Sequence, residues 1–233
     1  KDVNLEPNIN ELEQVTVTNK QNQLSNTSTI NVADLFSIPS VAGNFETILK
    51  TLPGVSTNNE LSSQYSVRGG NFDENLIYVN DVEINRPILV RNGQQEGLSF
   101  INSDFVTRAK FSAGGFDVRY GDKLSSVLDV RYDRPDSNQF IVNAGLLGAA
   151  VTSKYVSKND FLLIGLRYKN NSNVLAKQDQ KGIYSPNYGD MQLVYQYNFS
   201  DKFSLSALGN FNIGEFRLIP QDRETQFGTL ETQ

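Results

Sequence analysis

The sequence predicts an α+β domain followed by a set of long antiparallel β-strands. Residues 38–134 combine one helical apolar pattern with short apolar bursts bounded by Gly, Asn or Asp, which is typical of a small mixed sheet with short helices. Residues 135–233 instead alternate apolar and polar side chains over runs of about 8–12 residues. No apolar run approaches the ~20 residues that cross a bilayer as a helix, so a helical membrane protein is excluded.

The charge and composition exclude several function classes. The 233 residues carry 21 Lys and Arg against 26 Asp and Glu, which gives a formal net charge of −5. There is no basic surplus to neutralise phosphates, so we expect no nucleic-acid partner. The chain has no His and no Cys, which excludes His-dependent triads, Cys nucleophiles, zinc sites of the Cys/His kind and disulfides. We expect neither a cofactor nor a metal.

The N-terminal segment, residues 1–37, is polar and rich in Asn, Gln, Ser and Thr. Such a segment buries too little apolar surface to offset its ordering entropy, so we expect it to be flexible. Within it, residues 12–18 have high β propensity. They form either a local edge strand or a strand that adds to the sheet of another protein. Because the chain starts at Lys1 without an apolar signal core, we expect an internal fragment or a processed form.

Short elements follow in residues 38–134. Apolar residues recur at helical spacing from Val41 to Leu52, with Ser40 or Asn44 as the expected cap and Pro53-Gly54 as the end. A second short helix is expected between Gly97 and Asp104. The expected short strands are residues 65–67, 76–79, 82–84, 106–111 and 127–130.

The strands of residues 135–233 allow two interpretations. They are expected at residues 140–146, 162–169, 191–199 and 203–212, with a tight turn at Ser200-Asp201 and a long polar loop from Asn173 to Asp190. A soluble sandwich turns its apolar face inward. An outer-membrane barrel turns its apolar face to lipid and its polar face to the lumen, with aromatic residues near the strand ends. The pattern alone leaves both open.

Two motif blocks occur in order. The first joins Leu52-Pro53-Gly54-Val55, Arg68-Gly69-Gly70 and Asn80-Asp81-Val82; the second joins Arg119-Tyr120-Gly121 to the strand 125–130. Over about residues 40–133 they resemble the plug domain of TonB-dependent outer-membrane receptors, although Asn80-Asp81-Val82 replaces the common Asp-Gly-Val turn. The resemblance implies structural or gating roles for Pro53, Gly54, Arg68, Gly69, Gly70, Arg119, Tyr120 and Gly121.

The resemblance implies a plug domain at 38–134 and the first strands of a truncated transmembrane β-barrel at 135–233, in the Gram-negative outer membrane. It implies active transport without catalysis. The ligand would be an iron chelate, a cobalamin or an oligosaccharide. Residues 38–43, Ile-Pro-Ser-Val-Ala-Gly, look like receptors of Bacteroidetes-type bacteria.

Several partners follow from the same resemblance. They are a TonB-type periplasmic energiser, outer-membrane lipid, the transported ligand and a surface lipoprotein. A run that resembles the TonB box would bind the energiser; it comprises Leu12, Glu13, Gln14, Val15, Thr16, Val17 and Thr18. Loops at residues 55–63 and 88–97 would face the ligand. A barrel piece with open edges is also expected to self-associate.

Alternative interpretations remain at this point. Arg68, followed by two glycines, either ties the plug to carboxylates of a barrel wall or is a solvated side chain at a strand end. The whole chain could be a soluble β-rich carbohydrate-binding or adhesion domain. Asp129 and Asp133 could form the carboxylate pair of a hydrolase, but no other residue supports that chemistry.

Overall fold

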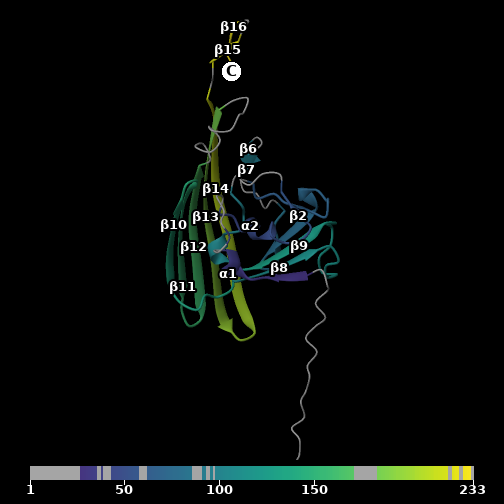
Figure 1. Ribbon diagram of the computed structural model, residues 1–233. Helices are drawn as coiled ribbons and strands as arrows, with labels where there is room; N and C mark the ends of the chain where they lie inside the picture. Colours follow the sequence, from purple (N-terminus) through teal and green to yellow (C-terminus); the bar gives the residue numbers. More distant parts are fainter. Residues whose placement is uncertain are drawn as a thin grey trace, which may run out of the picture.

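Two five-stranded sheets make up most of the fold. The computed structural model describes residues 27–35, 38, 43–57, 62–85, 91–92, 95–96, 98–170, 183–219, 222–225 and 228–231. The strand order is β1-β8-β9-β4-β5 in one sheet and β10-β11-β12-β13-β14 in the other, and the first sheet lies beside one face of the second (Figure 1). Among these residues, no helix is long and apolar enough to cross a membrane. The predicted strand at 12–18 lies outside them.

The first sheet belongs to the part of the chain that resembles a plug domain, and we call that part the plug. Its strands are β1 (Thr27–Ile30), β8 (Arg108–Ala113), β9 (Ser126–Arg131), β4 (Asn75–Val79) and β5 (Val82–Glu83). The pair β4–β9 is parallel and the other pairs are antiparallel. The strands predicted at 76–79, 82–84, 106–111 and 127–130 are confirmed. The sheet also takes a strand, β1, from inside the N-terminal segment that we expected to be flexible.

The plug helices are shorter than the sequence pattern predicts. They are α1 (Val32–Leu35), α2 (Glu46–Leu49) and the 3-10 turns η1 (Phe72–Glu74) and η2 (Ser103–Phe105). The expected Asn44 cap is wrong, because Phe45 precedes α2 with helical backbone angles and no side-chain cap. Ser40 lies outside the described residues. The helix expected between 97 and 104 is reduced to η2, where the Asn102 side chain accepts a hydrogen bond from Asp104 N.

Three two-stranded sheets accompany the two larger sheets. They are β2 (Val55–Ser56) with β3 (Ser66–Val67), β6 (Arg91–Asn92) with β7 (Gln95–Glu96), and β15 (Asp222–Thr225) with β16 (Gly228–Glu231). The strand predicted at 65–67 is therefore confirmed as β3. The loops expected to face the ligand are described only in part.

The second sheet is an antiparallel meander. Its strands are β10 (Gln139–Gly145), β11 (Gly148–Val156), β12 (Asp160–Asn170), β13 (Ile183–Ser200) and β14 (Phe203–Ile219). The predicted tight turn joins β13 to β14. Strand β11 was not predicted because its side chains are small and polar and barely alternate. The polar loop expected up to Asp190 is wrong from residue 183 onward, because that stretch pairs with β14 along its backbone.

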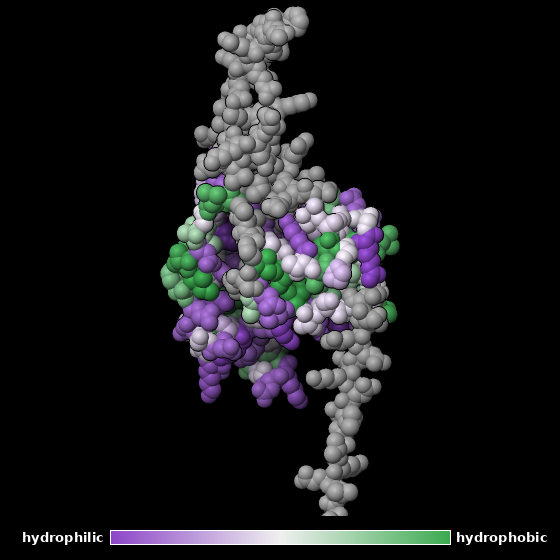
Figure 2. All heavy atoms as spheres, viewed as in Figure 1, coloured by the Kyte–Doolittle hydropathy of each residue, from purple (hydrophilic) through white to green (hydrophobic). Residues whose placement is uncertain are grey.

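The two faces of this sheet differ in polarity. One row across all five strands contains Val142, Val151, Leu166, Met191 and Phe211 and lies on the face away from the plug. Phe211 is 71% exposed there. Figure 2 shows apolar residues gathered over the side where β10 and β11 lie in Figure 1. An exposed apolar face is expected where strands contact lipid. A soluble sandwich would instead bury its apolar face.

The opposite face carries polar residues and packs on the plug. The neighbouring row on that face contains Asn143, Ala150, Arg167, Asp190 and Asn212. Three apolar residues of the same face, Phe161, Leu163 and Val194, join the buried core of the plug. The plug and the strand sheet therefore share one hydrophobic core, and a polar patch lies beside it.

Candidate functional site at the plug–barrel junction

Residues 98–105 of the plug sit directly on the polar face of β12 and β13. The guanidinium of Arg167 donates to both carboxylate oxygens of Asp190, at 2.8 and 2.7 Å. The same group donates to the carbonyl oxygens of Ser99 and Ile101, at 2.8 and 2.9 Å. The Asp190 side chain is fully buried and that of Arg167 is 12% exposed. A buried carboxylate therefore fixes the arginine, and the arginine holds two backbone groups of the plug.

Further polar contacts extend this patch. The Asp104 carboxylate accepts hydrogen bonds from Thr152 Oγ1 at 2.7 Å and from Asn143 Nδ2 at 3.1 Å. Gln192 Nε2 donates to the carbonyl of Phe100 at 3.1 Å. Each of these bonds joins the plug to the strand sheet. We call the set formed by Asp104, Thr152, Arg167, Asp190 and Gln192 the junction cluster.

Gly165 allows this close approach. A Cβ atom at this position of β12 would lie 2.4 Å from Asn102 Nδ2 and 3.1 Å from the ring of Phe105. The first distance is too short for real atoms and the second is tighter than most Cβ contacts, so a side chain here would force the Asn102 amide and the Phe105 ring to shift. The glycine in the middle of an apolar strand is therefore explained by the plug packed against it.

Glu46 of α2 connects the junction cluster to the plug interior. Its side chain is 1% exposed and accepts a hydrogen bond from Ser99 Oγ. Ser99 in turn presents its carbonyl to Arg167. Burial raises the pKa of Glu46, and the hydrogen bond from Ser99 opposes that rise only in part.

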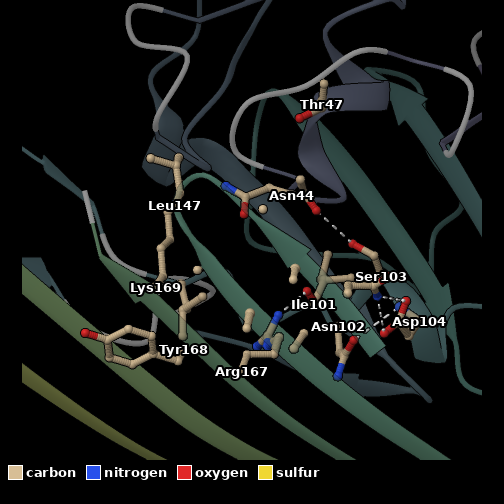
Figure 3. Close-up of a pocket in the computed structure, with 18 of the residues that line it drawn as sticks. Asn44, Thr47, Ile101, Asn102, Ser103, Asp104, Leu147, Arg167, Tyr168 and Lys169 are labelled. Carbon is tan, nitrogen blue, oxygen red and sulfur yellow. Dashed lines mark hydrogen bonds between the residues drawn. The ribbon is translucent and has the colours of Figure 1, made fainter. Parts of the chain in front are cut away.

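A cavity of about 520 Å³ opens beside the junction cluster. It lies between α2, the segment 98–104 and the ends of β10, β11 and β12 (Figure 3). Figure 3 shows Asn44, Asn102 and Asp104 on the plug side, with Arg167 and Lys169 on the wall side. The cavity therefore combines charged groups of both signs with apolar lining residues such as Leu98 and Leu147.

The first predicted motif block comes together around a strained turn. Arg68 has a positive φ of 51° and its backbone N donates to Gly54 O at 2.8 Å. A Cβ at Gly70 would lie 1.8 Å from Ser125 Oγ, so only glycine fits there. Pro53 lies in the turn before β2. The predicted pairing of Arg68 with barrel carboxylates is not tested by these contacts and stays a prediction.

The second motif block lies on the other face of the plug sheet. Tyr120 Oη donates to Asp129 Oδ2 at 2.9 Å, and its ring centroid lies 5.2 Å from that of Tyr78. Burial, followed by this hydrogen bond, raises the pKa of Tyr120 to about 12. Arg119 lies over the Tyr120 ring, with 5.2 Å from its Cζ to the centroid. The adjacent Gly121 has open space around it.

The carboxylates considered as a hydrolase pair belong to separate interactions. Asp129 accepts from Tyr120 and lies 3.3 Å from Arg131 Nε. Asp133 accepts from Arg108 Nε at 2.7 Å, and the pKa of Asp133 is lowered because its hydrogen bonds outweigh its partial burial. This arrangement does not favour hydrolysis.

The junction cluster itself was missed by sequence reasoning. The only available signal was that Arg167, Asp190 and Gln192 occupy polar positions of otherwise alternating strands. Their pairing depends on the register of β12 with β13, which places Arg167 opposite Asp190. The sequence does not contain that register in any local motif.

Comparisons with known proteins agree with this architecture. Residues 19–126 match the family described as the TonB-dependent Receptor Plug Domain. No curated protein matches the chain.

Solved structures are similar in fold across the plug and the strand sheet. The siderophore receptor PirA of Pseudomonas aeruginosa is 16% identical with a TM-score of 0.54, and the match covers 89% of this chain and 40% of PirA. The outer membrane transporter YddB of Escherichia coli is 12% identical with a TM-score of 0.56, and the match covers 86% of this chain and 34% of YddB. A mutant of the ferric enterobactin receptor of Pseudomonas aeruginosa, solved with enterobactin, is 17% identical with a TM-score of 0.51, and the match covers 84% of this chain and 33% of the receptor.

These similarities establish the fold. The chain spans about a third of the length of the ferric enterobactin receptor and the outer membrane transporter. The expected localisation in the Gram-negative outer membrane is confirmed by the plug-domain match. Residues 19–126 thus match the plug domain of TonB-dependent receptors, and together with the antiparallel strands that follow they have the same fold as part of the ferric enterobactin receptor.

Proposed function

We propose that this chain forms the gate of an outer-membrane receptor that imports a nutrient by active transport. The observation that carries the proposal is the junction cluster. It fastens one plug segment to the polar face of strands whose apolar face is exposed for lipid. A gate needs contacts of this kind, because hydrogen bonds at one patch can break while the strands keep their own pairing.

The proposed trigger is a pull on the N-terminal segment. Residues 12–18 would pair with a TonB-type energiser by adding a strand to its sheet. The next described element along the chain is β1, an edge strand joined to β8 by four residue pairs, from Thr27↔Ser112 to Ile30↔Ala109. An edge strand can peel away without breaking the rest of its sheet. A pull would therefore reach the plug at an edge strand.

The proposed ligand is a small nutrient, with an iron chelate as the first candidate. Two of the structurally similar proteins are described as receptors for siderophores or ferric enterobactin. Cobalamin and oligosaccharides remain the other ligand classes to test. A surface lipoprotein partner and an origin in Bacteroidetes-type bacteria belong to the same proposal and follow only from the resemblance.

The test uses the full-length gene in a Gram-negative strain that lacks its own receptors. Residues 12–18 are deleted in one variant, and a polar stretch of equal length, residues 19–25, is replaced by Gly and Ser in the control. We expect both variants to bind the labelled ligand, and only the deletion to lose uptake. Uptake that persists in a strain without any TonB-type energiser would refute the energised mechanism.

The alternative of a soluble β-rich binding domain is disfavoured by the exposed apolar face. Tyr197, Phe199 and Phe203 also cluster at the β13–β14 turn, with ring centroids 4.7 and 5.3 Å apart. Aromatic residues at strand ends are typical of membrane barrels. Recovery of the full-length protein in the soluble fraction, after cell lysis without detergent, would restore the alternative.

A further inference from the structure

A second, much smaller cavity lies inside the plug, away from the junction cluster. Its volume is about 20 Å³, and Glu46, Ser63, Gln64 and Tyr65 are among its lining residues. One water molecule needs roughly 10–15 Å³ of such space. The cavity is therefore large enough for one water and too small for an organic ligand.

Four buried polar atoms of residues that line this cavity have no hydrogen-bond partner among the residues that the structure describes. They are Glu46 Oε2, Ser63 Oγ, Gln64 Nε2 and Tyr65 Oη. The exposed fractions of Glu46, Ser63 and Tyr65 are 1%, 5% and 4%. Burial raises the pKa of Tyr65 and the nearby Ser126 opposes that rise, but the two hydroxyls do not meet the geometry of a hydrogen bond, and Ser126 Oγ donates instead to Asn75 Oδ1 at 2.7 Å. Buried polar groups in folded proteins are almost always satisfied, so four orphans around one void point to a missing partner.

We propose that this cavity is a binding site for one structural water, held by Glu46, Ser63, Gln64 and Tyr65. The chemistry of the four groups favours water over a cation. The Glu46 oxygen accepts hydrogen bonds when ionised and donates one when protonated, the amide nitrogen only donates, and the two hydroxyls do both. Water has two donors and two acceptors and satisfies this set. A cation would be repelled by the amide N–H groups of Gln64.

The water gives Glu46 a partner for each of its two oxygens. One oxygen accepts from Ser99, which belongs to the segment seated on the strand wall. The other would accept from the water, and through it contact residues 63–65. Those residues precede the Arg68-Gly69-Gly70 turn. The water site therefore connects, through one carboxyl group, the wall-seated segment with the segment that carries the first motif block.

Substitution of Ser63 gives a test whose sign depends on the water. If the water is present, Ser63→Ala removes one of its hydrogen bonds and increases local opening of the plug. We expect hydrogen exchange of residues 46–50 and 62–67 in the full-length receptor to accelerate about two- to tenfold. If the cavity is dry, the same change removes an orphan hydroxyl and slows exchange. The control is Ser56→Ala, an exposed serine of the neighbouring β2 strand.

A second variant and a direct observation complete the test. Tyr65→Phe should accelerate exchange in the same direction as Ser63→Ala. A high-resolution crystal structure of the receptor should show a solvent peak at hydrogen-bond distance, about 2.7–3.2 Å, from Glu46 Oε2 and Ser63 Oγ. An empty cavity, slower exchange in the variants, or a peak with oxygen distances near about 2.4 Å, as a cation gives, would overturn the proposal.

Discussion

Replacement of Arg167 by Met should release the plug segment 98–105 from the strand wall. The change removes two charge-assisted hydrogen bonds to plug carbonyls. It also leaves the Asp190 carboxylate buried with one described hydrogen-bond donor, the side-chain amide of Asn210 at 3.2 Å. Hydrogen bonds from charged groups contribute about 1.5–3 kcal/mol each. Loss of one partner of a buried ion pair costs about 3–5 kcal/mol. We take about 3 kcal/mol as the lower limit for the plug contact.

The measurement is hydrogen exchange of residues 98–105 in the full-length receptor, followed by mass spectrometry. A loss of about 3 kcal/mol corresponds to exchange about 100-fold faster. The double variant Arg167→Met/Asp190→Asn separates two effects, because it removes the uncompensated buried charge without restoring the bonds to the plug. We expect it to recover the thermal stability of the barrel while residues 98–105 still exchange rapidly.

The control is Arg108→Met, which breaks an ion pair with Asp133 whose side chains are 70% and 39% exposed. Such surface pairs contribute little, so exchange of residues 98–105 should stay within a few-fold of the wild type. Wild-type protection of residues 98–105 in the double variant would refute the reasoning, because it would mean that Arg167 neutralises Asp190 but does not hold the plug.

Three further predictions test other parts of the structure. Gly165→Ala should accelerate hydrogen exchange of residues 102–105 about tenfold, since overpacking costs about 1–3 kcal/mol. The control Gly209→Ala should have no effect, because Gly209 has open space around it. Equal effects of the two variants would contradict the close approach of the plug to Gly165. Hydrogen-exchange protection of α2, corrected for intrinsic exchange, should be greatest below pH 4.5, the ordinary pKa of Glu46, and should fall as pH rises through the raised pKa of the folded state. The reason is that in this range Glu46 ionises in the opened state but stays protonated in the closed state. Glu46→Gln should abolish this pH dependence. Ultraviolet titration should show one tyrosine with a pKa of about 12 that disappears in Tyr120→Phe, and an unchanged titration would contradict the contact with Asp129.

The local elements of the plug could be predicted because each has a local cause. Asn80 and Asp81 form the tight turn between β4 and β5 with positive φ. Gly70 is fixed by a neighbouring side chain, but the turn that contains it is visible in the motif. Helix α2 was predicted too long, because the apolar spacing from Val41 to Leu52 reports burial of that segment and not the hydrogen bonding of its backbone.

The strand sheet was predicted from alternation, and β11 was missed where alternation fails. Small and polar residues such as Ala150 and Thr152 carry little periodic signal, yet β11 pairs along its whole length with β12 and as far as Lys154 with β10. Backbone pairing between neighbouring strands does not require a strong side-chain pattern. Which face is buried also could not be decided, because alternation is the same for a sandwich and for a barrel.

The sequence by itself determined the order of the two parts, the period of the strands and the absence of His and Cys chemistry. These are properties of residue type and spacing along the chain. The tertiary structure alone decided that the apolar face of the strands is exposed, that Arg167 meets Asp190 and two plug carbonyls, and that Glu46 is buried between two plug segments. Each of these depends on residues far apart in the sequence, whose contact is fixed by strand register and packing and not by any local pattern.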